Sequence, residues 1–192
     1  MSLGVLEPQS YSSNQALILD ELHQSLAAVN AAEIETAQRR ILAAKRIFVA
    51  GAGRSGLALK MAAMRFMHLG LEVHVAGEVT APAIGSDDLL LIASGSGTTA
   101  SAVQAAEVAR KVGAEVLAVT ATRESKLANL AQWLIVIPAA TKQNLNGTAS
   151  AQYAGALFEQ SVMLLTDAMF HAMWHQWGES AEELYKRHAN LE

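Results

Sequence analysis

Short apolar runs alternate along this chain with longer stretches in which apolar positions recur every three or four residues. The runs predict buried strands over residues 46–50, 73–75, 87–93, 115–120 and 133–137. The longer stretches predict helices within 14–43 and over 54–69, 100–111, 125–130, 149–177 and 180–188. Strands that are apolar throughout are covered on both faces, so this alternation predicts a parallel sheet between two layers of helices.

Polar and small residues mark where these elements should begin and end. Asn30 is placed to cap the second of two N-terminal helices, with Glu33 three residues later as the partner of a capping box. Gly70 follows the helix after the first strand, at the position where a C′ glycine is common. Pro138 ends the last strand, and residues 139–148 are expected to form a polar loop.

Length and pattern together predict one α/β domain. Its expected architecture is a three-layer α-β-α sandwich around a five-stranded parallel sheet, of the Rossmann-like or flavodoxin-like kind. With 192 residues and no stretch that resembles an inter-domain linker, the chain is interpreted as a single domain over 1–192. The core is expected over about 30–175, with an N-terminal helix in 1–29 and a tail helix in 178–192.

The turn after the first strand, GAGRSG at residues 51–56, has the spacing of a dinucleotide-binding turn. Such a fold also has an acidic residue at the end of the second strand, and Glu78 is roughly in position. Against NAD, the chain has no room for a separate substrate domain, and Arg54 and Ser55 suit direct contacts with an anion. A cation is disfavoured at a helix start, which suggests an anionic neighbour for Arg54, either substrate or a carboxylate of another chain. An Arg54 side chain that is merely solvated is the alternative.

A second turn, SGSGTT at residues 94–99, offers four hydroxyls and two glycines at the head of the next helix. Backbone N–H groups at a helix start, with hydroxyls beside them, bind a phosphate monoester. Both turns follow strands, at the sheet edge where ligands bind in this fold class. The expected substrate-binding residues are Gly53, Arg54, Ser55, Ser94, Ser96, Gly97, Thr98 and Thr99. A turn that only caps its helix is the alternative.

Composition narrows the range of partners. The net charge is −4 and there is no long basic run, which argues against nucleic acid. The chain has no cysteine, which excludes a disulfide framework and a thiolate metal site and suits a reducing cytoplasm. No apolar stretch reaches the length of a membrane span, and the first residues lack the pattern of a signal peptide. We therefore expect a cytoplasmic protein without a membrane partner.

Glu159 is the candidate for proton transfer. Between Ser150 and Met173, Glu159 and Asp167 are the only charged residues of an otherwise apolar helix. Burial raises the pKa of a carboxyl group, which suits a general base that works near neutral pH. A buried carboxylate with a purely structural role is the alternative.

Asp167, His171 and His175 share one face of the same helix, in a stripe that could bind a metal. Two helical turns separate the ends of the stripe, and histidines beside Met and Trp often lie at packed interfaces, so no metal site is expected. The helix is also apolar on too many sides for a single contact. We therefore expect it to pack against another subunit.

Five segments occur in an order and spacing that resemble a known family: GAGRSG, MRFMHLG, GEVTAPAI, SGSGTT and GALFEQ. Over about residues 15–190 the chain closely resembles the 6-phospho-3-hexuloisomerases of the sugar isomerase (SIS) domain family. The resemblance implies a single SIS domain that isomerises D-arabino-hex-3-ulose 6-phosphate to fructose 6-phosphate through a cis-enediol, in the ribulose monophosphate route of formaldehyde fixation. It also implies an enzyme with no metal or organic cofactor that self-associates as a homotetramer, a dimer of dimers.

The resemblance also assigns roles to two residues. Glu159 stands in GALFEQ, where the family places its base. His68 stands in MRFMHLG, where the family has a histidine that reaches a neighbouring subunit's site to handle or orient a proton. The dipole at a helix C-terminus favours imidazolium there, and a simple capping histidine is the alternative. A helix of about 15 residues spans about 22 Å, so His68 can hardly reach its own phosphate turn, and a function for it implies an oligomer.

The chain departs from the family pattern at two places. The family often has Glu where this chain has Thr98, and threonine-rich residues where it has Val79-Thr80-Ala81. Neither change removes a hydroxyl from the phosphate turn, so the changes affect substrate contacts and leave the class intact. Another SIS isomerase, acting on arabinose 5-phosphate or sedoheptulose 7-phosphate, and a non-catalytic sugar-phosphate sensor are alternatives. The segment GALFEQ disfavours the first, and the presence of Glu159 disfavours the second.

Overall fold

The computed structural model describes residues 10–139 and 150–191. In these ranges the chain forms five strands and seven helices. The strands are β1 (Ile47–Gly51), β2 (Val73–Val75), β3 (Leu89–Ala93), β4 (Glu115–Thr120) and β5 (Trp133–Val136). The helices are α1 (Tyr11–Ala27), α2 (Ala31–Ala43), α3 (Gly53–His68), α4 (Ala100–Lys111), α5 (Lys126–Leu130), α6 (Ala156–Trp177) and α7 (Ala181–Tyr185). Every predicted strand is present, with ends that differ by one or two residues at most.

The strands form one parallel sheet in the order β2-β1-β3-β4-β5, which confirms the predicted five-stranded parallel sheet. The chain runs from β1 to β2 at one edge, then returns past β1 to β3 and continues to β5. Strand order therefore reverses between β1 and β3, where Gly51 pairs with Ala93. The two glycine-rich turns follow these neighbouring strands, so both lie at the carboxyl edge of the sheet.

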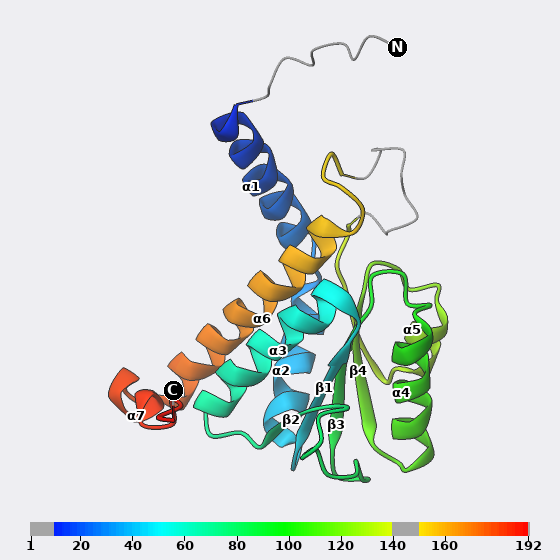
Figure 1. The fold of residues 1–192 in the computed structure, drawn as a ribbon, viewed down its shortest axis with the longest axis vertical. Helices are drawn as coiled ribbons and strands as arrows, with labels where there is room; N and C mark the ends of the chain where they lie inside the picture. The colour runs from blue at the N-terminus through cyan, green and yellow to red at the C-terminus, as the bar shows by residue number, and fades with distance from the viewer. Residues whose placement is uncertain (1–9, 140–149, 192) are drawn as a thin grey trace.

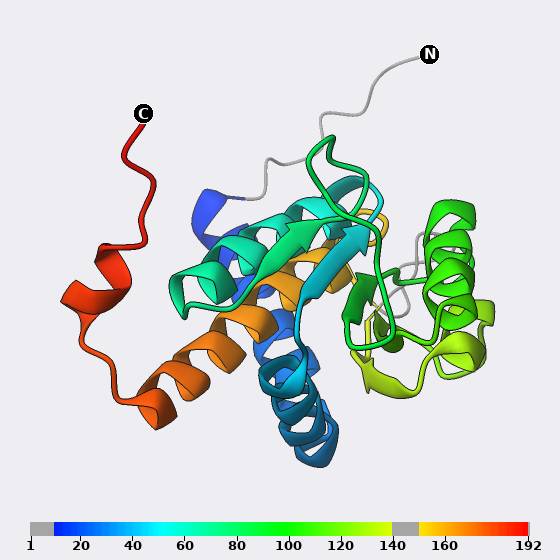
Figure 2. The same cartoon turned by 90° about the horizontal axis from the view of Figure 1, so that it is seen from below.

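Helices cover both faces of the sheet, as the apolar strands predicted (Figure 2). α2, α3 and α6 pack on one face, where Ile47 and Val49 of β1 join their buried side chains. α4 and α5 pack on the other face against Phe48 of β1. Alternation of side chains along β1 thus gives each face its own core and produces the three-layer α-β-α sandwich.

α1 and α7 lie near the two ends of the long helix α6 in Figure 1. α6 begins at Ala156, whereas the apolar pattern predicted a start near residue 149. Residues 150–155 instead form bends and turns, because the Glu21 carboxylate of α1 accepts hydrogen bonds from this segment, one of them from the Ser150 hydroxyl at 2.8 Å. Residues 140–149, which include most of the predicted polar loop, lie outside the described ranges. Within those ranges, no helix has the length and apolar character needed to cross a membrane.

Local caps fix several helix ends. The Asn30 side chain accepts a hydrogen bond from Ala32 N–H at 2.9 Å and caps α2, as predicted. The predicted capping box is wrong, since the Glu33 carboxylate instead accepts from Val136 N–H at 3.0 Å. Glu33 thus ties α2 to the end of β5. Gly70, with a φ of +86°, follows α3 as the predicted C′ glycine.

Candidate active site

The first glycine-rich turn joins β1 to α3, and its backbone segments approach so closely that there is no room for a side chain at Gly56. α3 begins at Gly53, whose φ of +57° favours glycine. A Cβ added at Gly56 would lie 2.4 Å from the carbonyl oxygen of Gly51. This close approach brings the N-terminal end of α3, with its unpaired backbone N–H groups, to the carboxyl edge of the sheet.

The second turn carries hydroxyl groups that bond to one another. Ser94 Oγ and Thr99 Oγ1 are 3.0 Å apart, and Thr98 Oγ1 donates to Ser96 Oγ at 3.1 Å. Thr99 occupies the N-cap position of α4, yet within the part of the chain that the structure describes its side chain makes no capping hydrogen bond. The turn is therefore more than a side-chain cap, which weighs against the capping-only interpretation.

The two turns and the start of α6 enclose one pocket. Five of the predicted substrate-binding residues line it: Gly53, Ser55, Ser94, Ser96 and Thr99. Glu159 lines the same pocket. The structure thus brings the candidate base and the hydroxyl-rich turn together within one chain.

The lining differs from the prediction at several positions. Gly97 is buried against the Ser125 side chain and Thr98 is exposed, and neither lines the pocket. The lining residues that sequence reasoning missed are Ala52, Ala93, Gly95, Gly155 and Phe158. Gly155 and Phe158 belong to GALFEQ, so that segment was an available signal for them. Gly95 was missed because its closeness to the Phe158 ring, 3.2 Å from an added Cβ, arises between distant parts of the chain.

Glu159 lies in the first turn of α6, where its side chain is only 6% exposed. Nε of Arg54 lies 2.6 Å from Glu159 Oε2, and the Arg54 side chain is 63% exposed. The expectation of an anionic neighbour for Arg54 is met, but that neighbour is a carboxylate of the same chain and not of another. The pair joins the first turn of α3 to the first turn of α6. Glu159 lines the pocket, whereas Arg54, a predicted substrate-binding residue, does not.

His68 ends α3, about 22 Å along the helix from Gly53. Its side chain is 5% exposed, and its ring stacks on that of His188 with centroids 5.2 Å apart. Burial lowers the pKa of His68, and the charges of His188 and Arg65 lower it further. The expectation of a favoured imidazolium is therefore not met, because burial and the two nearby charges all disfavour the protonated ring. His68 does not line the pocket of Glu159 in its own chain.

Glu78 and the histidine stripe take part in other contacts. The Glu78 carboxylate pairs with Lys60 Nζ at 2.7 Å, away from the pocket between the two turns. His171 and His175 place their Nε2 atoms 3.2 Å apart. Asp167 and His171 line a separate cavity at the far end of α3. No group of three potential metal ligands occurs among residues 10–139 and 150–191.

Comparison with known proteins gives consistent matches. Residues 40–164 match the SIS domain family. The chain is 50% identical over 181 residues to the 3-hexulose-6-phosphate isomerase of Mycobacterium gastri, which covers 94% of this chain and 91% of that protein. It is 39% identical over 178 residues to the protein of the same name from Bacillus subtilis, covering 92% and 96%. A crystal structure from Methanococcus jannaschii, for which that function is inferred, matches with a TM-score of 0.81 at 26% identity, covering 94% of this chain and 99% of that one.

Proposed function

The chain belongs to the SIS domain family, and we propose that it isomerises D-arabino-hex-3-ulose 6-phosphate to fructose 6-phosphate. The observation that carries this proposal is the pocket that joins a hydroxyl-rich turn to a carboxylate that is 6% exposed. A helix start with neighbouring hydroxyls suits the phosphate, and a sheltered carboxylate suits proton transfer between adjacent carbons. The likeness to relatives named for this reaction extends over 94% of the chain.

Moving the carbonyl from C3 to C2 needs no external oxidant or reductant. Glu159 takes the proton from C2, and the electrons of that C–H bond form the C2–C3 double bond of a cis-enediol as the C3 oxygen gains a proton. The O2 hydroxyl then loses its proton, C2 becomes the carbonyl, and Glu159 returns its proton to C3. One carboxylate serves both steps because C2 and C3 present the same face of the planar enediol to it.

The turn of residues 94–99 holds the phosphate in this proposal. The hydroxyls of Ser94, Ser96 and Thr99 and the N-terminal end of α4 supply hydrogen-bond donors to its oxygens. Ser55, across the pocket at the start of α3, contacts a sugar hydroxyl. Arg54 orients the Glu159 carboxylate through their ion pair.

His68 works at the site of a neighbouring subunit in this proposal, since about 22 Å of helix separate it from its own pocket. Leu57, Met61 and Met64 of α3 are exposed and provide an apolar face for self-association, for which we propose a homotetramer built as a dimer of dimers. The proposed setting is formaldehyde fixation by the ribulose monophosphate route in the cytoplasm.

A coupled assay tests the function. The purified 192-residue chain is given D-arabino-hex-3-ulose 6-phosphate, and fructose 6-phosphate is followed through auxiliary enzymes that reduce NADP. We expect steady formation of fructose 6-phosphate. Turnover of arabinose 5-phosphate or sedoheptulose 7-phosphate in place of the hexulose would identify a different SIS isomerase. Binding of sugar phosphates with no turnover of any of the three would identify a sensor.

A further inference from the structure

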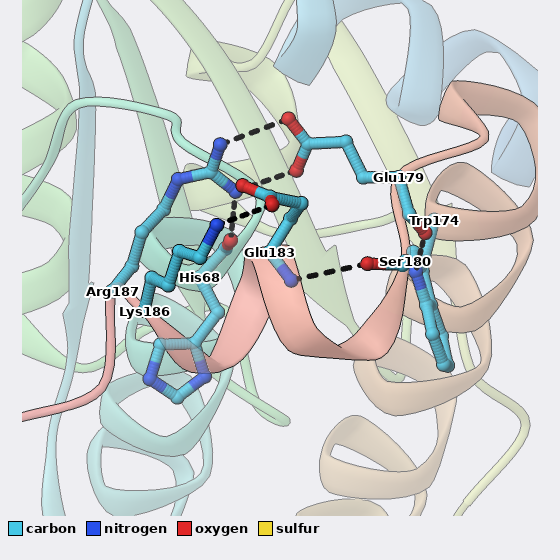
Figure 3. Close-up of polar contacts among 7 residues, drawn as sticks. All are labelled: His68, Trp174, Glu179, Ser180, Glu183, Lys186 and Arg187. Carbon is cyan, nitrogen blue, oxygen red and sulfur yellow. Dashed lines mark hydrogen bonds and ion pairs between the residues drawn. The ribbon is translucent and has the colours of Figure 1, made fainter.

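The segment after α6 folds back onto the C-terminal end of α3 (Figure 3). Nη1 of Arg187 donates a hydrogen bond to the backbone oxygen of His68 at 2.9 Å. The same guanidinium forms a two-pronged ion pair with Glu179, with N–O distances of 2.6 and 2.8 Å. Arg187 therefore binds one of the carbonyls that a helix end leaves without an intrahelical partner, and Glu179 holds Arg187 in place.

The imidazole of His68 is held mainly by packing. Its ring is stacked on that of His188, the residue after Arg187, at an interplanar angle of 27°. Nε2 of His68 is buried and has no hydrogen-bond partner in the part of the chain that the structure describes. A buried polar atom without a partner is costly, so the fold keeps Nε2 of His68 unsatisfied at a cost in stability.

His68 also lines an open cavity between α3, α6 and α7. The titratable and charged groups that share this cavity are Arg65, Asp167, His171, Tyr185 and His188. The imidazole of His68 is thus held by its stacking on His188, in the tail of residues 178–191, and it borders an open cavity. A side chain that acts at a neighbouring subunit's site must be oriented by contacts within its own chain. For His68 those contacts come from the residues after α6, because His68 does not line the pocket of Glu159 in its own chain.

We propose that Arg187, braced by Glu179, is a positioning residue for His68, fixing the end of α3 and the stacked tail so that the imidazole is oriented for proton handling at a neighbouring subunit's site. This inference rests on the role proposed above for His68. The nearby ion pair of Lys186 with Glu183 is more exposed than the one that Arg187 forms. Lys186 and Glu183, with side chains 67% and 51% exposed, join two surface positions of the same segment to each other.

Arg187→Met and Lys186→Met form a matched pair, since each replaces one cation with an unbranched apolar side chain. We expect Arg187→Met to lower kcat at least tenfold with KM changed less than twofold, and Lys186→Met to leave both within twofold. In NMR titrations, the His68 signal is identified by its loss in His68→Gln. Its pKa should rise toward the ordinary histidine value in Arg187→Met, because a loosened tail exposes the ring to water. Glu179→Gln should give a smaller change in the same direction.

The outcomes separate this inference from the function on which it rests. If His68→Gln keeps the wild-type kcat, His68 has no part in the reaction and the positioning role is overturned, while the isomerase activity stands. If His68→Gln is slow but Arg187→Met and Glu179→Gln keep the wild-type kcat and His68 titration, the positioning role alone is overturned. A lower melting temperature with kcat and titration unchanged also overturns it, since that marks a purely structural ion pair. If Arg187→Met does not fold, Glu179→Gln decides the question.

Discussion

Arg54 and Glu159 join the first turns of α3 and α6, with Arg54 Nε 2.6 Å from Glu159 Oε2. Each of the two charges stabilises the other in a position that is unfavourable for it alone. A cation is disfavoured at the start of α3, and a carboxylate that is 6% exposed needs partners when it is ionised. The Arg54 side chain is 63% exposed, so it can turn toward a bound anion without rearranging the core. The candidate base is thus oriented by a partner that can respond to a ligand.

Glu159→Gln tests the assignment of the base. The amide keeps the size of the side chain and one acceptor oxygen, but it does not accept a proton at neutral pH. We therefore expect kcat to fall by about 10²–10⁴-fold with little change in KM, measured in the fructose 6-phosphate assay. Circular dichroism should show an intact fold. Near-normal turnover by the folded variant would remove Glu159 from the role of base.

Ser96→Ala combined with Thr99→Ala tests the phosphate turn. Both residues line the pocket, and each lost hydrogen bond to a charged phosphate costs about 1.5–3 kcal/mol, so KM should rise at least tenfold with kcat largely retained. Ser101→Ala, an exposed position of α4, is the matched control and should keep the wild-type KM. Inorganic phosphate should raise the melting temperature of the wild type more than that of the double variant. An unchanged KM in the double variant would place the phosphate elsewhere.

Local pattern was enough to predict most of the fold. β3 is apolar throughout, and Asn30 and Gly70 mark helix ends through contacts within a few residues of the chain. The start of α6 was not predictable in this way. The residues before it are held out of the helix by hydrogen bonds to Glu21 of α1, and no feature of the apolar pattern reveals a partner so far away in the sequence.

The candidate site, too, has features that local pattern predicts and features that depend on residues far apart in the sequence. The two turns could be recognised because glycines and hydroxyls follow strands, and parallel topology brings such turns to one edge. For Arg54 the expected anionic neighbour was substrate or a carboxylate of another chain, and local pattern could not reveal Glu159 because the two residues are far apart in the sequence. The lowered pKa of His68 was missed because part of its cause lies far away in the sequence, in burial and in the charge of His188, on whose ring the His68 ring stacks.

A comparison of Gly97→Ala with Gly178→Ala tests how tightly the phosphate turn is packed. Both have positive φ angles, +62° and +75°. A Cβ on Gly97 would lie 2.1 Å from Ser125 Oγ, whereas nothing lies within 4 Å of a Cβ on Gly178. Urea unfolding should show a loss of about 1–2 kcal/mol for Gly178→Ala, from left-handed strain alone, and about 2–4 kcal/mol for Gly97→Ala, from strain and overpacking. Equal losses would mean that the turn relaxes around an added methyl group.

Asp88, immediately before β3, gives the fold a dependence on pH. Its carboxylate accepts hydrogen bonds from Arg46 Nε at 2.9 Å, Arg46 Nη2 at 2.7 Å and Gly85 N–H at 2.6 Å. Burial raises the pKa of Asp88, but these hydrogen bonds and the Arg46 charge outweigh burial and hold the pKa below its usual range. The folded chain therefore binds this proton less readily than the unfolded chain does.

Asp88→Asn should remove a contribution that exists only while the carboxylate is ionised. That contribution is complete above the unfolded pKa of about 4 and is lost as pH falls through the lower folded pKa. Urea unfolding should therefore find the variant about 2–4 kcal/mol less stable than the wild type at pH 7, with a gap that narrows below about pH 4. Glu78→Gln is the control, because its pair with Lys60 is half exposed on both sides and solvent screens it. A gap for Asp88→Asn that stayed constant down to about pH 3 would mean that shape, and not charge, makes Asp88 stabilising.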